Sequence, residues 1–297
     1  MKKTALITDL DNTLFDWVEL WLNCFSSMLD SIVEISGIDK AKLLPEIAAV
    51  HQRHGTSEYS FLIDEVPSLQ KVLKGRPATE VFAKSIQIYR SKRREHLRLY
   101  PTVAESLLKI KGRGTRIVGY TESMAFYSNY RVRRLGLDGV LDYVFCPEDH
   151  RLPAGLSADD LRHYPASHYG LKLTRQEFTP KGSKKPDAAV LNAIMADLEL
   201  SKGDCVYVGD NLMKDVAMAV DCGVDAVWAK YGQAHKRPEY KLLQEVTHWT
   251  AEEVEREQKI KEREHVDPNF TLEDNFSEIL DLFDFGGFHV ERSKTAR

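Results

Sequence analysis

Short apolar segments typical of strands alternate with longer segments of helical periodicity, and this alternation constrains the fold more than any other feature of the chain. The strand-like segments are residues 4–10, 116–121, 143–145, 204–209 and 225–229. The helical segments are residues 103–111, 125–135, 186–198 and 212–222. Strands and helices that alternate at this spacing predict an α/β fold, a doubly wound Rossmann-like parallel sheet with helices on both faces.

A long insertion interrupts this alternation after the first strand-like segment. Residues 17–99 show helical periodicity, broken by glycine and proline, and contain no convincing strand. The segment has the size of a small domain. We therefore expect an inserted all-helical domain at residues 17–99, a discontinuous core at residues 1–16 and 100–285, and a tail at residues 286–297.

The connections in the second half of the chain are longer than such a core requires. Residues 146–184 are polar, irregular and contain several prolines, and a loop of this length is commonly functional or mobile. A capping box at residues 250–253 opens a charged run to residue 264, which we expect to form a solvated helix. Residues 270–272 and 276–283 are expected to form a last edge strand and a last helix.

The composition is that of a soluble globular protein, with 43% hydrophobic and 29% charged residues among 297. The formal net charge of -4 does not indicate a nucleic-acid polymer or a membrane as partner. The four cysteines lack C-x-x-C and metal-ligand spacings, so we expect reduced thiols in a cytoplasmic protein. The first apolar run breaks at Asp9, and no run reaches ~18 uncharged residues, so we expect neither a signal peptide nor a membrane span. The sequence does not indicate the oligomeric state.

Polar residues lie at the carboxyl ends of three of the strand-like segments: Asp9 and Asp11, then Thr121, then Asp210. Ligands of parallel α/β sheets bind outside the carboxyl ends of the strands. Asp9 and Asp11 are two residues apart, which places both side chains on one side of an extended segment. Two adjacent carboxylates repel unless a cation such as Mg²⁺ or a shared proton separates them. The alternative is an aspartate pair that only stabilises a turn.

Two further candidates lie at helix starts. Asp210 and Asp215 follow a strand and open a helix, where capping and the helix dipole alone would explain Asp210 well and Asp215 poorly. Lys185 precedes Pro186 at the start of another helix, a position suited to holding an anion. A solvated surface charge is the alternative for this lysine.

Taken together, these motifs resemble those of the haloacid dehalogenase (HAD) superfamily. The run Asp-Leu-Asp-Asn-Thr at residues 9–13 is similar to its first motif, Asp-x-Asp-x-Thr, and Thr121 looks like its second. Lys185 looks like the third, and Gly-Asp-Asn-Leu-Met-Lys-Asp at residues 209–215 looks like the fourth. The resemblance covers residues 3–232, and the first and fourth motifs carry most of its specificity.

The resemblance implies catalytic roles for four residues. Asp9 would attack phosphorus and form an aspartyl-phosphate, as carboxylate nucleophiles do. Asp11 would protonate the leaving oxygen and then activate the water that releases phosphate. Thr121 and Lys185 would hold the phosphoryl oxygens.

The resemblance also implies Mg²⁺ as cofactor. The Asp9 carboxylate, the Asp11 backbone carbonyl and Asp210 would bind the ion, and Asp215 would orient these ligands or join them. A bound Mg²⁺ would neutralise the repulsion between carboxylate and phosphate. Thr13 would fix the turn of the first motif.

The helical insertion matches the family's C1 cap, a lid that closes over the substrate. Arg53, His54 and Tyr59, near an expected break between cap helices, are candidates to contact the leaving group, and plain surface residues are the alternative. Glu122 departs from the family pattern, because small or amide residues are commoner after the second motif.

The implied function is that of a HAD-like phosphatase, a Mg²⁺-dependent hydrolase of phosphate monoesters. Its substrate would be a small phosphorylated metabolite such as a nucleotide or a sugar phosphate. A phosphomutase would share every motif, and a non-catalytic interaction protein on the same fold is a second alternative. Asp11 argues against a dehalogenase, because dehalogenases of this superfamily lack an acid there, and against a metal-pumping ATPase, which carries threonine.

Overall fold

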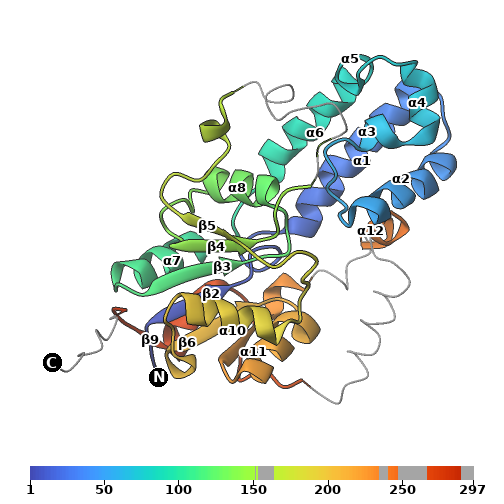
Figure 1. Cartoon of the computed structure of the whole chain (residues 1–297). Helices are drawn as coiled ribbons and strands as arrows, with labels where there is room; N and C mark the ends of the chain where they lie inside the picture. The colour runs from blue at the N-terminus through green and yellow to red at the C-terminus, as the bar shows by residue number, and fades with distance from the viewer. Residues whose placement is uncertain (151, 153–163, 234–239, 247–265, 289–297) are drawn as a thin grey trace.

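The computed structural model describes residues 1–150, 152, 164–233, 240–246 and 266–288 (Figure 1). Seven parallel strands form the central sheet in the order β5-β4-β3-β2-β6-β7-β8. They are β2 (Ala5–Thr8), β3 (Arg116–Tyr120), β4 (Tyr143–Cys146), β5 (Arg175–Phe178), β6 (Cys205–Gly209), β7 (Asp225–Ala229) and β8 (Phe270–Leu272). A separate parallel pair joins β1 (Lys2–Lys3) to β9 (Asp284–Phe285). The predicted doubly wound α/β fold is confirmed.

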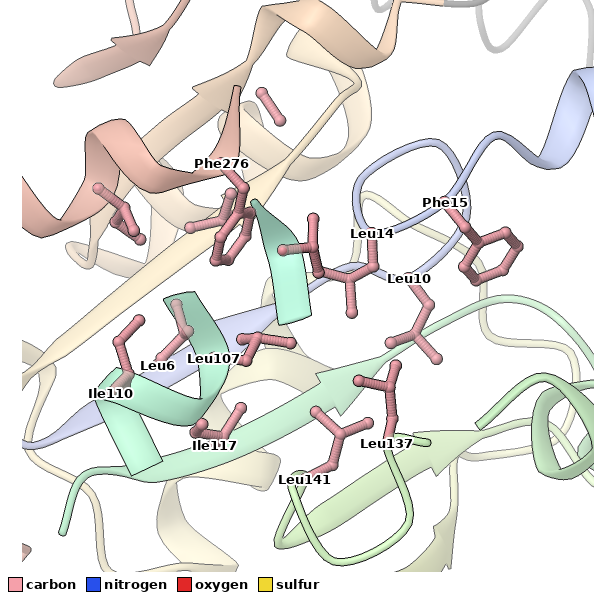
Figure 2. Close-up of a cluster of buried hydrophobic side chains, with 14 of the residues drawn as sticks. Leu6, Leu10, Leu14, Phe15, Leu107, Ile110, Ile117, Leu137, Leu141 and Phe276 are labelled. Atoms are coloured by element: carbon pink, nitrogen blue, oxygen red, sulfur yellow. The ribbon is translucent and has the colours of Figure 1, made fainter. Parts of the chain in front are cut away.

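Helices cover both faces of this sheet, as the continuous burial of its central strands requires. Alternate residues of a strand point to opposite faces, so Leu6 joins one apolar cluster and Ile7 the other. Figure 2 shows Leu6 beside Leu107 and Ile110 of α7 (Val103–Gly112). The second cluster contains side chains of the helices α10 (Ala188–Asp197) and α11 (Ala217–Cys222). Within the described ranges, α8 (Ala125–Arg134) and α14 (Ile279–Leu282) are the other α-helices of the core.

The helices between β2 and α7 form a separate bundle beyond one end of the sheet (Figure 1). They are α1 (Trp17–Ser36), α2 (Lys40–His54), α3 (Leu62–Glu65), α4 (Pro67–Leu73), α5 (Ala78–Val81) and α6 (Ala83–His96). The bundle has its own apolar cluster, which includes Trp21, Phe25 and Phe82. We refer to this bundle as the cap.

One later segment leaves the core and packs against the cap. The short helix α12 (Tyr240–Glu245) follows β7 in the chain and lies beside α2 in Figure 1. Leu243 and Val246 belong to the apolar cluster of the cap, although they lie outside the range 17–99 expected for it. The His51 ring donates from Nδ1 to the Val246 carbonyl oxygen at 2.7 Å. A segment that follows β7 in the chain therefore packs against the cap.

This buried histidine is expected to make the stability of the protein depend on pH. Burial lowers the pKa of His51 from 6.5 to about 4, although its bond to the Val246 carbonyl acts in the opposite direction. The unfolded chain then binds a proton that the folded chain does not, so stability is lost as the pH falls below 6.5. Between pH 7 and pH 5 this loss is roughly 2 kcal/mol.

We expect His51→Gln, which keeps a donor for the carbonyl, to remove this part of the pH dependence. Urea unfolding of both proteins at pH 7 and pH 5 measures it. An equal loss of unfolding free energy in the two proteins would show that His51 is not responsible.

Several elements differ from the sequence-based expectation. Residues 146–184 contain the edge strand β5, which the sequence analysis missed because its residues Arg-Gln-Glu-Phe show no apolar pattern. The expected helix at residues 212–222 begins with a π-helical turn, Leu212–Val216, before α11. The strand at residues 270–272 is confirmed at the sheet edge, and residues 276–283 form a 3₁₀ turn followed by α14. The expected charged helix lies outside the described residues, and no described helix is long and apolar enough to span a membrane.

Candidate active site

The carboxyl ends of β2, β3 and β6 bring six of the predicted site residues together. Hydrogen bonds connect five of them in two groups, one around Lys185 and one around Asp11, and the carboxylate of the sixth, Asp210, lies near the first group. The six residues are Asp9, Asp11, Thr121, Lys185, Asp210 and Asp215. The structure thus places the predicted motifs at one site, as the switch points of parallel sheets predict.

Lys185 is buried between two aspartates. Its Nζ donates to Asp9 Oδ1 at 2.6 Å, to Asp215 Oδ1 at 2.9 Å and to the Tyr120 carbonyl oxygen at 2.9 Å. An ammonium group has three donors, so all three are used. The Tyr207 hydroxyl donates to the same Asp215 oxygen at 2.9 Å. Lys185 and Asp215 are therefore fixed in place, and Asp9 keeps Oδ2 on the other side of its carboxyl group, where Thr13 Oγ1 lies 3.4 Å away.

This group carries an excess of negative charge. Burial raises the pKa of Asp9 to about 8. Lys185 acts to lower this pKa, and the neighbouring Asp215 and Asp11 carboxylates offset part of that lowering. Burial, together with Asp215 and Asp9, also raises the pKa of Asp210 well above its ordinary value. Burial alone would lower the pKa of Lys185, but Asp215 and Asp9 raise it well above its ordinary value. One lysine thus faces three carboxylates, a charge distribution that a cation would neutralise.

The same carboxylates fit a divalent cation. Asp9, Asp210 and Asp215 each offer an oxygen, and these oxygens lie within 4.8 Å of one another. An all-oxygen donor set suits Mg²⁺. The donor chemistry of the site is therefore compatible with the predicted metal.

The local structure around Asp215 explains its position. Asn211 caps the π-helical turn by accepting bonds from the Met213 and Lys214 amides at 3.0 and 3.1 Å. The wide turn returns Asp215 toward β6, where its Oδ2 accepts a bond from the Asn211 amide at 3.2 Å. A Cβ atom at Gly209 would lie 2.4 Å from the Asp215 Cβ, so this approach requires glycine. Such π turns are frequent at functional sites.

Asp11 forms the second group. Its Oδ2 accepts bonds from Thr121 Oγ1 at 3.0 Å and Ser123 Oγ at 2.7 Å. Its Oδ1 accepts a bond from Arg131 Nη1 at 3.2 Å. Donors on both oxygens fix the direction of this carboxyl group.

Three polar residues at this site were not predicted from the sequence. Ser123 follows the second motif by two residues, so its proximity to Thr121 was a usable signal. Arg131 is one of several arginines in α8 and has no distinguishing neighbour in the sequence. Glu58, from the cap, accepts a bond from Arg131 Nη2, and only the tertiary fold shows this contact.

Glu122, the departure from the family pattern, faces lysines. Its Oε1 accepts a bond from the Lys185 amide at 3.1 Å and its Oε2 from Lys214 Nζ at 3.0 Å. Burial would raise the pKa of this carboxyl, but Lys214 and Lys185 outweigh it and lower the pKa. Glu122 therefore positions the backbone of Lys185.

The three cap candidates gather around another cap residue. Glu65 accepts bonds from Arg53 at 3.1 Å and from the Tyr59 hydroxyl at 2.5 Å, and its Oε2 lies 2.8 Å from His54 Nε2. The His54 and Tyr59 rings stack with centroids 3.6 Å apart. Among the described residues, no hydrogen bond joins these three side chains to Asp9 or Asp11.

Comparison with known proteins decides the family. A model of haloacid dehalogenase-like hydrolases matches residues 3–223, which is more than half of the chain. The chain belongs to this family. A curated relative of this HAD-like hydrolase, the glyceraldehyde 3-phosphate phosphatase of Methanocaldococcus jannaschii, is 23% identical over 227 residues, covering 75% of this chain and 83% of the relative.

Solved structures of the family share the fold. A 2-haloacid dehalogenase from Pseudomonas syringae pv. tomato matches with a TM-score of 0.55 and 21% identity, over 95% of this chain and 98% of the other. A structure assigned as a β-phosphoglucomutase from Thermotoga maritima matches with a TM-score of 0.50 and 17% identity, over 94% of this chain and 97% of the other. Because identity is low, these matches establish the fold and leave the reaction open.

Proposed function

We propose that this HAD-like hydrolase is a Mg²⁺-dependent phosphatase, which cleaves a phosphate monoester of a small metabolite, such as a nucleotide or a sugar phosphate, through an aspartyl-phosphate on Asp9. The observation that carries the proposal is the cluster of Asp9, Asp210 and Asp215, whose oxygens lie within 4.8 Å of one another beside the second carboxylate, Asp11. The phosphatase name of the curated relative supports a phosphate ester as substrate.

Each of these residues would have a distinct catalytic role. Asp9 Oδ2 would attack phosphorus while Lys185 holds Oδ1 and so fixes the direction of attack. Asp11 would give a proton to the leaving-group oxygen as the ester bond breaks, and would then take a proton from the water that hydrolyses the aspartyl-phosphate. Thr121 and Lys185 would bind phosphoryl oxygens. This requires Thr121 to turn its hydroxyl from Asp11, and Lys185 to give up its bond to Asp215 or to the Tyr120 carbonyl oxygen.

A bound Mg²⁺ would supply positive charge that offsets the repulsion between these carboxylates and the phosphate. Asp9 and Asp210, with the Asp11 backbone carbonyl, would hold the ion. Asp215 would orient Lys185 and the metal ligands. The four cysteines are buried free thiols, which supports the proposed cytoplasmic location.

Phosphate release from a panel of phosphorylated metabolites and p-nitrophenyl phosphate, measured with Mg²⁺, tests the proposal, with the Asp9→Asn protein as blank. We expect Mg²⁺-dependent release from a few related esters. No release, but isomerisation of a sugar phosphate, would make the protein a mutase. If neither phosphate release nor isomerisation is seen, and no aspartyl-phosphate is trapped after quenching, the protein would be a non-catalytic interaction protein.

Removing the metal should stop the reaction reversibly. We expect EDTA to reduce phosphate release to the blank and added Mg²⁺ to restore it, because three buried carboxylates otherwise repel an incoming phosphate. Ca²⁺ added at the same concentration serves as the control, since Ca²⁺ prefers more ligands and longer bonds. Full activity in EDTA would remove Mg²⁺ from the mechanism.

Changing the second carboxylate should slow both proton transfers. We expect Asp11→Asn to lower kcat by ~10²-fold or more, the usual contribution of a general acid and base. Esters with better leaving groups should be affected less in the first step, since p-nitrophenolate departs without a proton. A series of phenyl phosphates of varied leaving-group acidity measures this difference, and equal losses across the series would contradict the role of Asp11 as acid.

A further inference from the structure

Arg131 joins the two parts of the molecule at the candidate active site. It lies on the core helix α8, and its side chain is buried, with a relative exposure of 4%. Its Nη1 donates to Asp11 at 3.2 Å and to Ser123 Oγ at 2.9 Å. Its Nη2 donates to Glu58 of the cap. One guanidinium therefore contacts both the proposed general acid and the cap.

Glu58 reaches this position from the loop after α2. Its side chain is also largely buried, with a relative exposure of 9%. One carboxylate oxygen accepts the bond from Arg131, and the other accepts a bond from Trp17 Nε1 at 3.1 Å. A second pair, Ser60 and Tyr127, joins cap and core nearby, with their hydroxyl oxygens 3.0 Å apart. The carboxylate of Glu58 is thus fixed at the junction of cap and core.

This arrangement leaves Arg131 without charge to offer a substrate. Asp11 and Glu58 both face this one guanidinium, and the Glu58 carboxylate alone balances its charge while Asp11 carries the proton that it donates. Another guanidinium, that of Arg93 of α6, lies over the Tyr130 ring at 4.0 Å. An anionic leaving group beside Asp11 would therefore find the charge of Arg131 already balanced by Glu58. The Glu58 carboxylate on the other side of the guanidinium would repel such an anion, and this repulsion is strong where water is excluded.

The leaving group of the proposed reaction must lie beside Asp11, since Asp11 donates the proton to it. We propose that the Glu58–Arg131 pair selects the leaving group: the enzyme cleaves esters whose leaving group is uncharged and hydroxyl-bearing, and rejects those whose leaving group carries a carboxylate or second phosphate. This inference rests on the proposed phosphatase function. It makes Glu58 and Arg131 the specificity-determining residues, ahead of the group around Glu65.

Two three-carbon esters test this selectivity, because they differ in one end group. Glycerol 3-phosphate has a neutral hydroxymethyl group where 3-phosphoglycerate has a carboxylate. We expect the wild-type protein to favour glycerol 3-phosphate by at least ~10-fold in kcat/KM. We expect Glu58→Gln to raise kcat/KM for 3-phosphoglycerate by at least ~10-fold relative to that for glycerol 3-phosphate, because the substitution removes a like charge at close range.

Two variants serve as controls. Glu58→Asp keeps the charge and is expected to keep the discrimination. Glu34→Gln makes the same charge change on the cap at an exposed residue paired with Lys84, and is expected to leave the ratio unchanged. Urea unfolding of each variant verifies that the fold is retained.

The outcomes separate the two proposals. Equal turnover of both esters by the wild-type protein, or an unchanged ratio in Glu58→Gln, overturns the selectivity while the phosphatase function stands. Loss of discrimination in Glu34→Gln as well would assign the effect to overall charge and also overturn it. Absence of phosphate release from every ester overturns the phosphatase function, and the selectivity with it.

Discussion

Replacing Asp9 with asparagine is expected to lower phosphate release by roughly 10³-fold or more, the scale of loss when a nucleophile is removed. An amide oxygen is a poor nucleophile and cannot form the acyl phosphate that water then hydrolyses. The fold should remain, because the amide oxygen can still accept the bond that Asp9 Oδ1 receives from Lys185. The substitution also removes one of three crowded carboxylates, so it relieves repulsion.

Single-turnover kinetics with a radiolabelled ester distinguish this role from a purely structural one. The wild-type protein should retain label on the chain after an acid quench, and Asp9→Asn should retain none. Asp30→Asn, the same chemical change at an exposed cap position, is the matched control and should behave as wild type. Label retained by Asp9→Asn would place the nucleophile elsewhere.

Much of this site could be predicted from the sequence, because a polar residue marks the end of each short apolar strand. Asp9, Thr121 and Asp210 each follow a buried apolar strand, and parallel strands bring such ends to one edge of the sheet. The strand order, which places β2 between β3 and β6, makes these three residues neighbours. The roles of the residues came from the resemblance, since spacing alone does not separate a metal site from a helix cap.

Contacts between distant elements could not be predicted in the same way. Lys185 and Asp215 are 30 residues apart, and only the packing of α10 and the π-helical turn against β6 places the ammonium between two carboxylates. The Glu58–Arg131 pair depends on how the cap sits on the core, which no local pattern encodes. The three candidates around Glu65 were chosen by their place in the sequence, and that place does not specify the direction of their side chains.

Edge elements were missed for a related reason. Strand β5 pairs on one side with β4 and is half exposed, so it needs no apolar run. The segment around Leu243 and Val246 is short, and it is identified as part of the cap only by the cluster it joins. Periodicity therefore predicts elements that the core buries and gives little signal for those at its margins.

Gly209→Ala is expected to have the second largest effect, because it acts on Asp215 through packing alone. The added Cβ would lie 2.4 Å from both Cβ and Cγ of Asp215, a distance that forces the turn to move. Movement of Asp215 would break its bonds to Lys185 and Tyr207 and leave buried polar groups without partners. We expect a loss of about 1–3 kcal/mol in unfolding free energy from the overpacking, and a fall in kcat/KM of ~10²-fold or more.

The matched control is Gly112→Ala at the end of α7, where a Cβ atom meets nothing within 4 Å. Alanine favours a helix over glycine by up to ~1 kcal/mol, so this variant should be as stable as wild type or more stable, with unchanged activity. Urea unfolding and Mg²⁺ titration of activity compare the two variants. Because Asp215 is proposed to hold the metal ligands in register, Gly209→Ala should require more Mg²⁺ for half-maximal rate. Wild-type stability, rate and Mg²⁺ requirement in Gly209→Ala would show that Asp215 tolerates displacement and that Asp9 and the Tyr120 carbonyl suffice to position Lys185.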